Sequence, residues 1–275
     1  MSGHAGQADD RGAAGPAVGP LARIDALDVD ATIADPARKQ QFVTPMFDVI
    51  APRYDAFTRL FSFGMDRGWK RQLLERVEAR LGPAATILDI ACGTGDLAVQ
   101  LARSDETRRV LGIDASTEMV RVARRQHGAR PVVFVTGDVM ALPLPTGSIS
   151  AATAGYAIRN APTLDGALSE LARVIAPGGW IGVLDFYRPS AWWWRAPFLG
   201  YLRVAGDLVG WWWHRRPVVY GYIARSIARF TSVDGFGAAL ERAGFEVVET
   251  RRYLLGGIAV HVARRVTRDS SRAPT

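Results

Sequence analysis

The amino-acid sequence predicts an α/β fold built on a doubly wound, mostly parallel sheet of seven strands. Three observations lead to this prediction. Short β-rich runs alternate with helical patterns from residue 86 onward, the chain turns through Gly93 and Gly95 after the first run, and two further runs end the chain. A length of 275 residues with 48% hydrophobic side chains can supply one sizeable core, so a second domain is not required.

The first 35 residues are rich in Gly, Ala, Pro and Asp and contain no apolar run long enough for a signal peptide. They read as a disordered leader, which we extend to cover 1–38. The acidity of this leader also argues against a mitochondrial transit peptide. Apolar residues at helical spacing follow in 41–81, interrupted by Pro52 and Gly64. We therefore expect a helical cap over 39–82, made of two or three short helices.

The centre of the sheet is predicted between residues 86 and 186, where the strand-like runs are separated mostly by helical patterns. One such helix carries Leu164, Leu168, Leu171 and Ile175 and ends at Pro177-Gly178-Gly179. Alternation of this kind gives a parallel sheet, whose ligands bind at the carboxyl ends of the strands. The predicted strands are Thr86–Ile90, Val110–Ile113, Val132–Val135, Ile149–Ala154 and Trp180–Phe186.

The last third of the chain differs from the centre. We expect a helical insertion over 188–230 and a helix at Phe236–Ala243. Phe245–Tyr253 and Ile258–Arg265 then read as two strands of a hairpin, joined through Leu254-Leu255-Gly256-Gly257. The predicted domain spans 39–268, followed by a short tail at 269–275.

The decapeptide Ile87–Asp96 ends an apolar strand in Asp89 and turns through two glycines into a helix. Gly93 and Gly95 let the backbone adopt a positive φ or approach a ligand closely. The turn fits the loose dinucleotide pattern G-x-G-x-x-A, and Asp114 lies near the distance of a ribose-binding acid. Carboxylates on both sides of the turn instead disfavour a pyrophosphate and favour a cationic cofactor. S-adenosylmethionine carries a sulfonium and an ammonium, so we favour a methyltransferase over an NAD enzyme. The closing strand pair, typical of class I methyltransferases, favours it further.

Three acids, Asp89, Asp114 and Asp138, are predicted at the ends of consecutive strands. Asp114 is placed to accept hydrogen bonds from two ribose hydroxyls. Asp138 is placed to accept from the adenine amine, with Val139 and Met140 as an apolar face. Each aspartate alone could instead cap the following helix or turn. Because three aspartates stand at corresponding positions of consecutive strands, we favour cofactor binding as their role.

Arg159 and Asn160 follow the fourth predicted strand. Arg159 is too basic to act as a general base but can stabilise an oxyanion, and its alternative role is an ion pair with a nearby carboxylate. The four histidines are far apart without metal spacing, so we expect no metal, and His261 fits a structural role better than a catalytic one. The single cysteine, Cys92, excludes an intramolecular disulfide and a cysteine-rich zinc site.

The net charge of +7 combines −4 in residues 1–35 with +11 in the remainder. The arginines are scattered, so solvation is the default interpretation, and no motif points to nucleic acid.

Six of the eight tryptophans lie in the arginine-containing segment 190–216. This composition suits peripheral contact with an anionic bilayer, and the segment is too short to span one. Alternatively, the segment is a lid whose tryptophans pack on the core or wall the substrate pocket. The two roles are compatible.

Several segments together resemble the ubiquinone/menaquinone biosynthesis C-methyltransferase family over roughly residues 42–265. They are 46–55 (MFDVIAPRYD), 87–96, Gly137-Asp138 with Leu142-Pro143, Arg159-Asn160, Arg173-Val174 with Pro177-Gly178-Gly179, Tyr220-Gly221-Tyr222 with Ser226-Ile227, and 256–261 (GGIAVH). The resemblance implies methyl transfer from S-adenosylmethionine to a ring carbon of a polyprenylated quinol. It also implies Arg159, Asn160 and Tyr222 as catalytic residues. The cofactor set that we expect is Tyr54, Asp89, Ala91, Gly93, Thr94, Gly95, Asp114, Asp138, Val139 and Gly155.

The chain also departs from the family pattern. Thr58 stands where the family usually has Asn, Gly155-Tyr156-Ala157-Ile158 replaces Ser-Phe-Gly-Leu, and Ser148-Ile149-Ser150 lacks the usual Phe-Asp. These changes and the tryptophan-rich insertion leave the acceptor open. Two alternatives stay open. One is a methyltransferase for another hydrophobic molecule (polyketide, terpenoid or tocopherol-like phenol), and the other is a non-catalytic subunit of a quinone-biosynthesis complex. The proton acceptor is left open between water, Tyr222 and His261. We expect a cytoplasmic protein, at the inner face of the membrane if it contacts one, and leave a homodimer open.

Overall fold

The computed structural model describes residues 31, 35–128, 131–214 and 218–267, so most of the predicted leader and the tail beyond residue 267 lie outside the described part. The helices within the described residues begin with α3 (Pro36–Ile50), η1 (Ala51–Arg53), α4 (Tyr54–Phe61) and α5 (Asp66–Glu78). The alternating part follows as β1 (Thr86–Ile90), α6 (Asp96–Ser104), β2 (Arg109–Asp114), α7 (Thr117–His127), β3 (Val132–Thr136), β4 (Ile149–Gly155), η2 (Ile158–Asn160), α8 (Leu164–Val174) and β5 (Ile175–Phe186). The chain continues through α9 (Trp192–His214), α10 (Val218–Arg229), α11 (Val233–Arg242), β6 (Phe245–Tyr253), η3 (Leu254–Gly256) and β7 (Ile258–Arg265).

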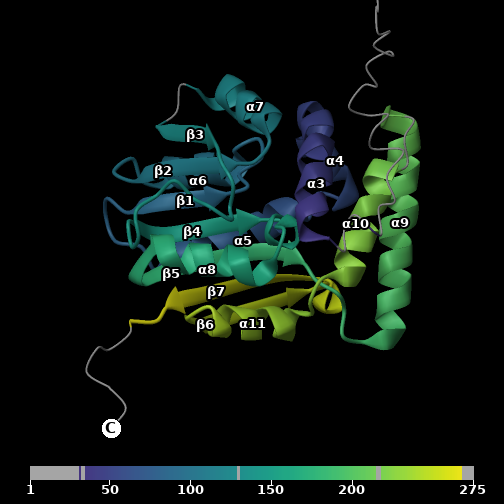
Figure 1. The fold of residues 1–275 in the computed structure, drawn as a ribbon. Helices are drawn as coiled ribbons and strands as arrows, with labels where there is room; N and C mark the ends of the chain where they lie inside the picture. Colours follow the sequence, from purple (N-terminus) through teal and green to yellow (C-terminus); the bar gives the residue numbers. More distant parts are fainter. Residues whose placement is uncertain (1–30, 32–34, 129–130, 215–217, 268–275) are drawn as a thin grey trace, which may run out of the picture.

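The seven strands form one sheet in the order β3-β2-β1-β4-β5-β7-β6 (Figure 1). Strands β1 to β5 pair in parallel, and β7 lies antiparallel between β5 and β6. This arrangement confirms the predicted mostly parallel sheet with a closing antiparallel pair. It is the fold of class I methyltransferases.

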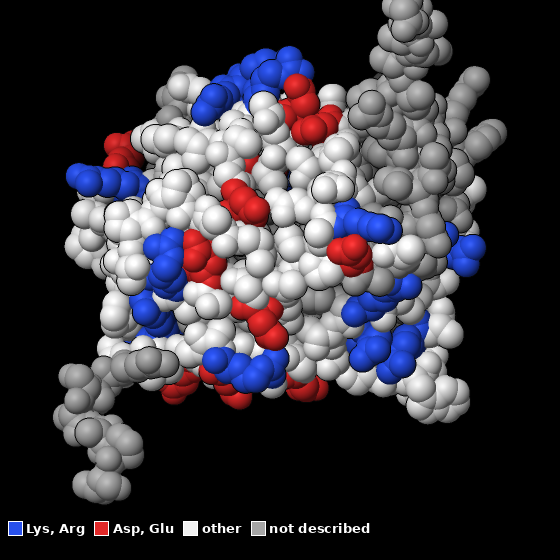
Figure 2. Space-filling model, viewed as in Figure 1, with Lys and Arg blue, Asp and Glu red and all other residues white. Residues whose placement is uncertain are grey.

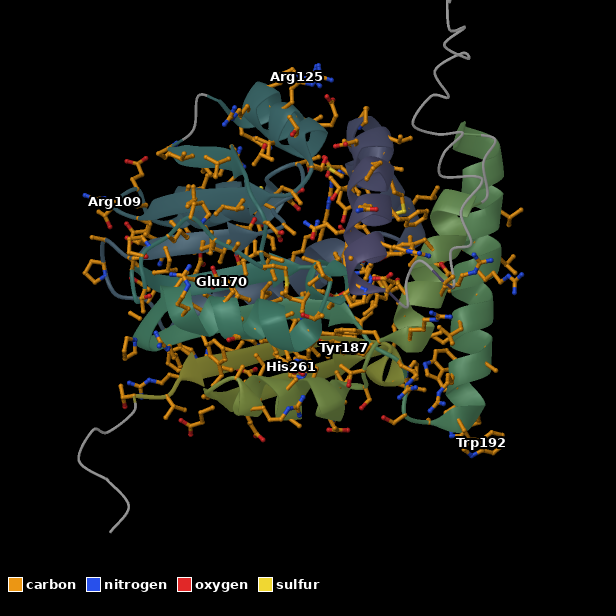
Figure 3. The ribbon with its side chains drawn as sticks, in the orientation of Figure 1. Arg109, Arg125, Glu170, Tyr187, Trp192 and His261 are labelled. Carbon is orange, nitrogen blue, oxygen red and sulfur yellow. The ribbon has the colours of Figure 1, made fainter. Side chains whose placement is uncertain are left out.

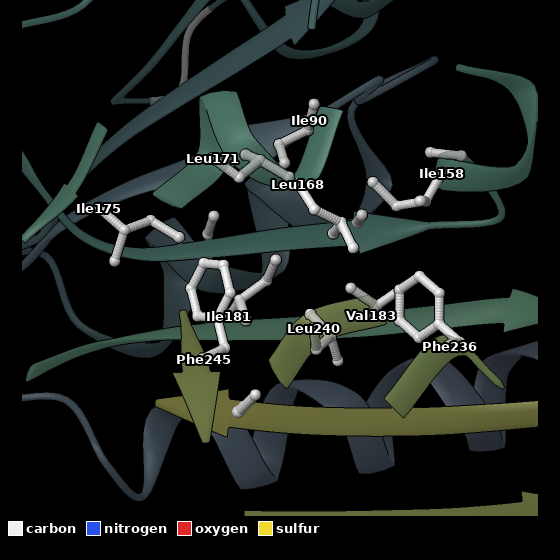
Figure 4. Close-up of a cluster of buried hydrophobic side chains, with 14 of the residues drawn as sticks. Ile90, Ile158, Leu168, Leu171, Ile175, Ile181, Val183, Phe236, Leu240 and Phe245 are labelled. Atoms are coloured by element: carbon white, nitrogen blue, oxygen red, sulfur yellow. The ribbon is translucent and has the colours of Figure 1, made fainter. Parts of the chain in front are cut away.

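Two layers of helices cover the sheet. On one face α5, α6 and α7 pack on the strands, and on the other face lie α8 and α11. Figure 4 shows the second of these cores, where Leu168 and Leu171 of α8 meet Ile181 of β5 and Phe236 of α11. These side chains are fully buried.

Three elements begin earlier than the sequence predicts. Ser232 caps α11 by accepting from the amide of Gly235 at 3.1 Å, so this helix begins at Val233 rather than Phe236. Asp35 caps α3 in the same way, so the helical cap begins inside the predicted leader. Strand β5 begins at Ile175, which the sequence analysis placed in the preceding helix, because Ile175 already pairs with β4. It therefore takes in Pro177-Gly178-Gly179, where that helix was expected to end.

A third core lies at the carboxyl ends of the parallel strands, where α3, α9 and α10 pack together (Figure 1). Its buried side chains include Phe42 and Met46 of α3, Phe198 and Leu202 of α9, and Tyr222 of α10. The predicted insertion over 188–230 therefore consists of two helices that cover this end of the sheet. Among the described helices, none is long and apolar enough to cross a bilayer.

Candidate active site

A cleft enclosing about 750 Å³ opens at the carboxyl ends of β1, β2 and β4, beneath α3 and the start of α4. Open α/β sheets bind their ligands at this edge, and the volume suits a small molecule. Eight of the predicted site residues line this main cleft, namely Tyr54, Ala91, Gly93, Asp114, Asp138, Val139, Gly155 and Asn160.

A second pocket of about 390 Å³, which we call the polar arm, adjoins the main cleft. The two share Tyr54, Ala91, Gly93, Gly155 and Tyr156 as wall residues. The other walls of the polar arm include five polar side chains, Asp55, Lys70, Asp89, Thr94 and Asp96. The site therefore joins a charged compartment to a larger one with Val43, Phe47, Ile113, Met119 and Val139 in its wall.

The two glycines of the turn after β1 have different roles. Gly93 has a φ of +55° and lines both pockets, and a Cβ there would meet only Tyr54, at 3.8 Å. Gly95 has a φ of +90° and lines neither pocket, and a Cβ there would lie 2.6 Å from the ring of Phe134. Gly95 therefore permits close packing behind the turn, which corrects its predicted place among the residues that face the cofactor.

Asp89 is buried within β1. Its carboxylate accepts hydrogen bonds from the Thr153 hydroxyl at 2.8 Å and from the amide of Ala98 at 3.2 Å. Burial raises the pKa of Asp89 to about 7. A cation in the polar arm would favour the ionised form of this carboxyl.

Asp114 and Asp138 both accept backbone hydrogen bonds in the turns that follow their strands, and both line the main cleft. Asp114 accepts from the amides of Ser116 and Gly93, each at 2.8 Å, and Asp138 accepts from the amide of Met140 at 2.9 Å. Both residues still line the main cleft, and each carboxylate oxygen has a second lone pair. Burial raises the pKa of Asp114 to about 6.

The N-terminal cap supplies side chains to the polar arm. The hydroxyl of Thr94 donates to Asp55 at 2.6 Å, which fixes the glycine turn against α4. Lys70 of α5 forms an ion pair with Asp96 at 2.9 Å, at the first position of α6. Asp55 and Lys70 were not among the predicted site residues, because the sequence does not reveal that the cap folds back onto the turn.

Arg159 forms the ion pair that the sequence analysis gave as its alternative role. Its Nη1 lies 2.6 Å from Asp185 and donates to the carbonyl of Tyr156 at 2.7 Å, and its own amide donates to Asp185 at 3.1 Å. The side chain is buried and does not line the main cleft. This corrects the expectation that Arg159 is a catalytic residue: in the described structure it organises the loop after β4.

Asn160 lines the main cleft, and Tyr222 lies directly behind it. The hydroxyl of Tyr222 donates to Asn160 Oδ1 at 3.1 Å, and the Tyr222 ring packs against Phe42 with centroids 5.5 Å apart. Burial raises the pKa of Tyr222, so the phenol stays neutral. Tyr222 is therefore suited to orient the Asn160 amide rather than to accept a proton.

Lys39 of α3 is a cation that the sequence analysis missed. Its ammonium donates to the carbonyls of Arg159 at 2.8 Å and Ala161 at 2.6 Å, which ties α3 to the loop after β4. Burial, followed by the charge of Arg159, lowers the pKa of Lys39 to about 8. These contacts span more than a hundred residues of sequence, and no local pattern predicts them.

Tyr156, which was also absent from the predicted site residues, lines both pockets and has an unusual conformation. Its φ is +59°, which is strained for a side chain of this size, and its buried hydroxyl has no hydrogen-bond partner in the structure. The ring packs against Phe186, with centroids 5.2 Å apart. A signal existed in the sequence, because Tyr156 stands where the resembled family usually has Phe.

His261 has the structural role that the sequence favoured. Its Nδ1 lies 3.2 Å from the Tyr187 hydroxyl and its Nε2 lies 3.1 Å from the carbonyl of Val233, so Nε2 carries the proton (Figure 3). Burial lowers the pKa of His261 to about 4, and the residue does not line the main cleft. The idea that it accepts a proton in the reaction is therefore wrong. Across the described residues, no group of His, Cys, Asp or Glu is arranged to hold a metal ion.

Comparison with protein families matches residues 35–265 to the ubiE/COQ5 methyltransferase family. The chain is 36% identical over 232 residues to a ubiquinone/menaquinone biosynthesis C-methyltransferase UbiE of Rubrivivax gelatinosus, covering 84% of this chain and 90% of that protein. It is 37% identical over 239 residues to a demethylmenaquinone methyltransferase of Thermus thermophilus, covering 80% of this chain and all of that protein.

Similarity to solved structures supports only the fold of this chain, because the sequence identities are low. The [4+2]-cyclase SpnF matches with a TM-score of 0.61 and 20% identity, covering 83% of this chain and 96% of that one. A chain from a complex between the Haloferax volcanii Trm112 methyltransferase activator and a methyltransferase matches with a TM-score of 0.59 and 19% identity, covering 80% and 98%. Because one of these is a cyclase, the shared fold does not identify a reaction.

Proposed function

This chain belongs to the ubiE/COQ5 methyltransferase family and is an S-adenosylmethionine-dependent methyltransferase; from that premise, we propose that it methylates a ring carbon of a polyprenylated quinol. The names of its relatives support both a benzoquinol and a naphthoquinol acceptor. The observation that carries the proposal is the union of the charged polar arm with the larger main cleft, through the wall residues that they share.

The residues present fit S-adenosylmethionine. When bound, this cofactor supplies an electrophilic methyl group on a sulfonium. Asp114 would hold the ribose hydroxyls, and Asp138 with Val139 would hold the adenine. Tyr54, Ala91, Gly93 and Gly155 would form the wall around the sulfonium, and Asp89 and Thr94 would lie toward its amino-acid part. The unpartnered hydroxyl of Tyr156 is consistent with a ligand in this cleft, because a buried hydroxyl without a partner is costly.

The charges behind the cleft favour an anionic acceptor. Lys39 and Arg159 carry two positive charges against one negative charge on Asp185, so the loop after β4 is net positive while Lys39 is protonated. A quinol hydroxyl has a pKa of about 10, as tyrosine does, and nearby positive charge lowers it. Loss of the hydroxyl proton raises the electron density of the ortho carbon. That carbon takes the methyl group, and the ring becomes aromatic again when its C–H proton is lost.

Asn160 is placed to orient the acceptor. Its side chain lies at the cleft wall, with Oδ1 held by Tyr222 and Nδ2 donating to the Tyr156 carbonyl at 3.3 Å. Fixed orientation of the ring carbon toward the methyl group would contribute much of the rate acceleration. In this scheme Arg159 and Tyr222 act through Asn160 and the loop, so we assign them positioning roles.

The proposal is tested with the purified full chain and S-adenosylmethionine labelled in its methyl group. We expect label to enter reduced demethylmenaquinone or a reduced polyprenyl benzoquinol, and not the oxidised forms, because a quinone has no hydroxyl to ionise. Absence of transfer to every reduced quinone, with cofactor binding intact by calorimetry, would contradict the proposal.

The departures from the family pattern favour a second candidate, a methyltransferase for another hydrophobic phenol. Tyr156 adds a hydroxyl to the wall of both pockets, and Ala157 and Ile158 follow it in place of the usual residues. Label in a polyketide, terpenoid or tocopherol-like phenol, with none in any quinol, would select this candidate.

A further inference from the structure

The outer face of α9 carries a row of exposed apolar side chains. Trp193, Val204 and Leu208 are 57%, 59% and 62% exposed, and Pro197 and Tyr201 are also exposed. Their spacing of three or four residues places all five on one face of the helix. At about 1.5 Å per residue, the row is about 22 Å long.

The opposite face of α9 is covered by protein. Phe198 and Leu202 are buried in the third core, where α9 packs on α10, so α9 is fixed with its apolar row facing outward. Figure 1 shows α9 at the outer edge of the molecule, and Figure 3 places Trp192 at its far end. The side chains of the outer row therefore take no part in the hydrophobic core.

Two neighbouring segments extend this row into a surface. Phe63, in the turn between α4 and α5, is 74% exposed, and its ring stacks on Tyr201 with centroids 6.0 Å apart. At the other end, the indole of Trp194 donates to the carbonyl of Leu254 at 2.9 Å, which places exposed Leu255 beside the start of α9. We define the α9 surface as the exposed apolar side chains Leu60, Phe63, Trp192, Trp193, Pro197, Tyr201, Val204, Leu208 and Leu255. Contiguous exposed patches of this kind mark interaction sites.

The charges beside the α9 surface are basic. Arg188, just before α9, and Arg203 of α9 are exposed, and Arg195, in the first turn of α9, is half-buried. The acid of α9, Asp207, has a side chain outside the described set, as do Trp211–Trp213, while Arg215 and Arg216 lie beyond the helix in the undescribed gap. Indole rings and arginines together match the headgroup level of an anionic bilayer.

We propose that the α9 surface docks flat on an anionic bilayer, with α9 parallel to the membrane plane. This inference rests on the proposed function, because a polyprenylated acceptor resides in the bilayer. A second copy of the chain is the weaker candidate, because a twofold contact through this face would bring like-charged arginines together. Docking would hold the end of the sheet that carries the main cleft beside the lipid, so the acceptor need not enter water.

The test is sedimentation of the full chain with vesicles of phosphatidylcholine, with and without phosphatidylglycerol. One variant combines Trp193→Ser, Val204→Ser and Leu208→Ser. The matched control combines Val133→Ser, Val248→Ser and Val266→Ser, which replaces three exposed apolar side chains at the sheet edges and near the end of the described chain. We expect binding that requires phosphatidylglycerol and weakens with salt, a loss of at least about 10-fold in the α9 variant, and no change in the control. Wild-type protein that stays in the supernatant, or an α9 variant that sediments like wild type, would overturn the proposal.

Two further measurements separate this inference from the proposed function. Methylation of a short-chain, water-soluble quinol should be equal in wild type and α9 variant, whereas methylation of a long-chain quinol in vesicles should fall in the variant. Vesicle binding without any methylation would refute the function and keep the docking. If light scattering shows a dimer that the α9 variant dissolves, and vesicles do not bind, the face is a contact between two copies and the docking proposal is wrong.

Discussion

At the scale of single residues, the site is defined by groups whose hydrogen bonds are incomplete or whose charge is unusual for their burial. The Tyr156 hydroxyl has no partner, and its backbone is in a left-handed conformation. Lys39 is a half-buried cation with two carbonyl acceptors. Loss of water costs stability both at the unpartnered Tyr156 hydroxyl and at the Lys39 ammonium, and both residues adjoin the loop that carries Asn160. We read them as features kept for ligand binding.

Replacing Tyr156 by Phe separates stability from binding. The change removes a buried unpartnered hydroxyl, so the free energy of unfolding should stay the same or rise. If a ligand accepts from this hydroxyl, its affinity should fall by about 2- to 12-fold, since a net hydrogen bond contributes about 0.5–1.5 kcal/mol. Calorimetry gives the Kd of S-adenosylmethionine, and kinetics give the KM of the quinol.

Tyr187→Phe is the matched control, because that hydroxyl is already bonded to His261 in the core. It should lower the free energy of unfolding and leave both ligand affinities unchanged. A Tyr156→Phe variant that resembles the Tyr187→Phe variant would assign Tyr156 a purely structural role.

The pH dependence of the rate should report on Lys39. Its folded pKa of about 8 lies below the ordinary value of 10.5, so Lys39 is charged below pH 8 and loses its charge as the pH rises through that value. If this charge stabilises the quinol anion, kcat should contain a falling limb near pH 8. Lys39→Arg should retain the rate and move the limb upward, whereas Lys39→Gln should lower the rate and remove it. Identical profiles in all three proteins would exclude the electrostatic role.

At the scale of elements, the sequence predicted the sheet well and the loop after β4 poorly. All seven strands and the closing hairpin follow from local periodicity and turn residues, because strand content is a local property. The Arg159–Asp185 ion pair joins the ends of β4 and β5, and the Lys39 contacts join α3 to η2. Such pairings depend on which strand ends become neighbours. The early starts of β5 and α11 had the same origin, in pairing and capping rather than in periodicity.

The β6–β7 hairpin should weaken at low pH through His261. Its folded pKa of about 4 lies below the ordinary 6.5, so the unfolded chain binds the proton more readily. The stability that this residue contributes is present above pH 6.5 and is lost as the pH falls toward 4. Urea unfolding at pH 7.5 and pH 5 should therefore show a smaller loss in His261→Gln than in wild type. An equal loss in both proteins would place the acid sensitivity elsewhere.

At the scale of the whole molecule, one end of the sheet contains both compartments of the site, and α9 and α10 cover that end. Over the face in Figure 2, basic and acidic side chains are interspersed, as expected of a solvated surface. The net charge of +7 therefore does not by itself indicate a partner. The α9 surface differs, because its exposed side chains are apolar with arginines beside them. The composition of segment 190–216 indicated an interaction surface. The sequence alone did not show which side chains of α9 face outward and which are buried; the orientation of the helix in the structure shows this.

The central claim, methylation at carbon of a quinol in the main cleft, is tested most directly by the position of the new methyl group. Purified protein is supplied with S-adenosylmethionine carrying a ¹³C methyl and with reduced demethylmenaquinone or a polyprenyl benzoquinol, and the product is examined by carbon NMR. The account predicts a methyl bonded to a ring carbon, at a rate that Asn160→Ala lowers sharply without weakening cofactor binding. A methyl on oxygen, or an unaltered rate in Asn160→Ala, would contradict it.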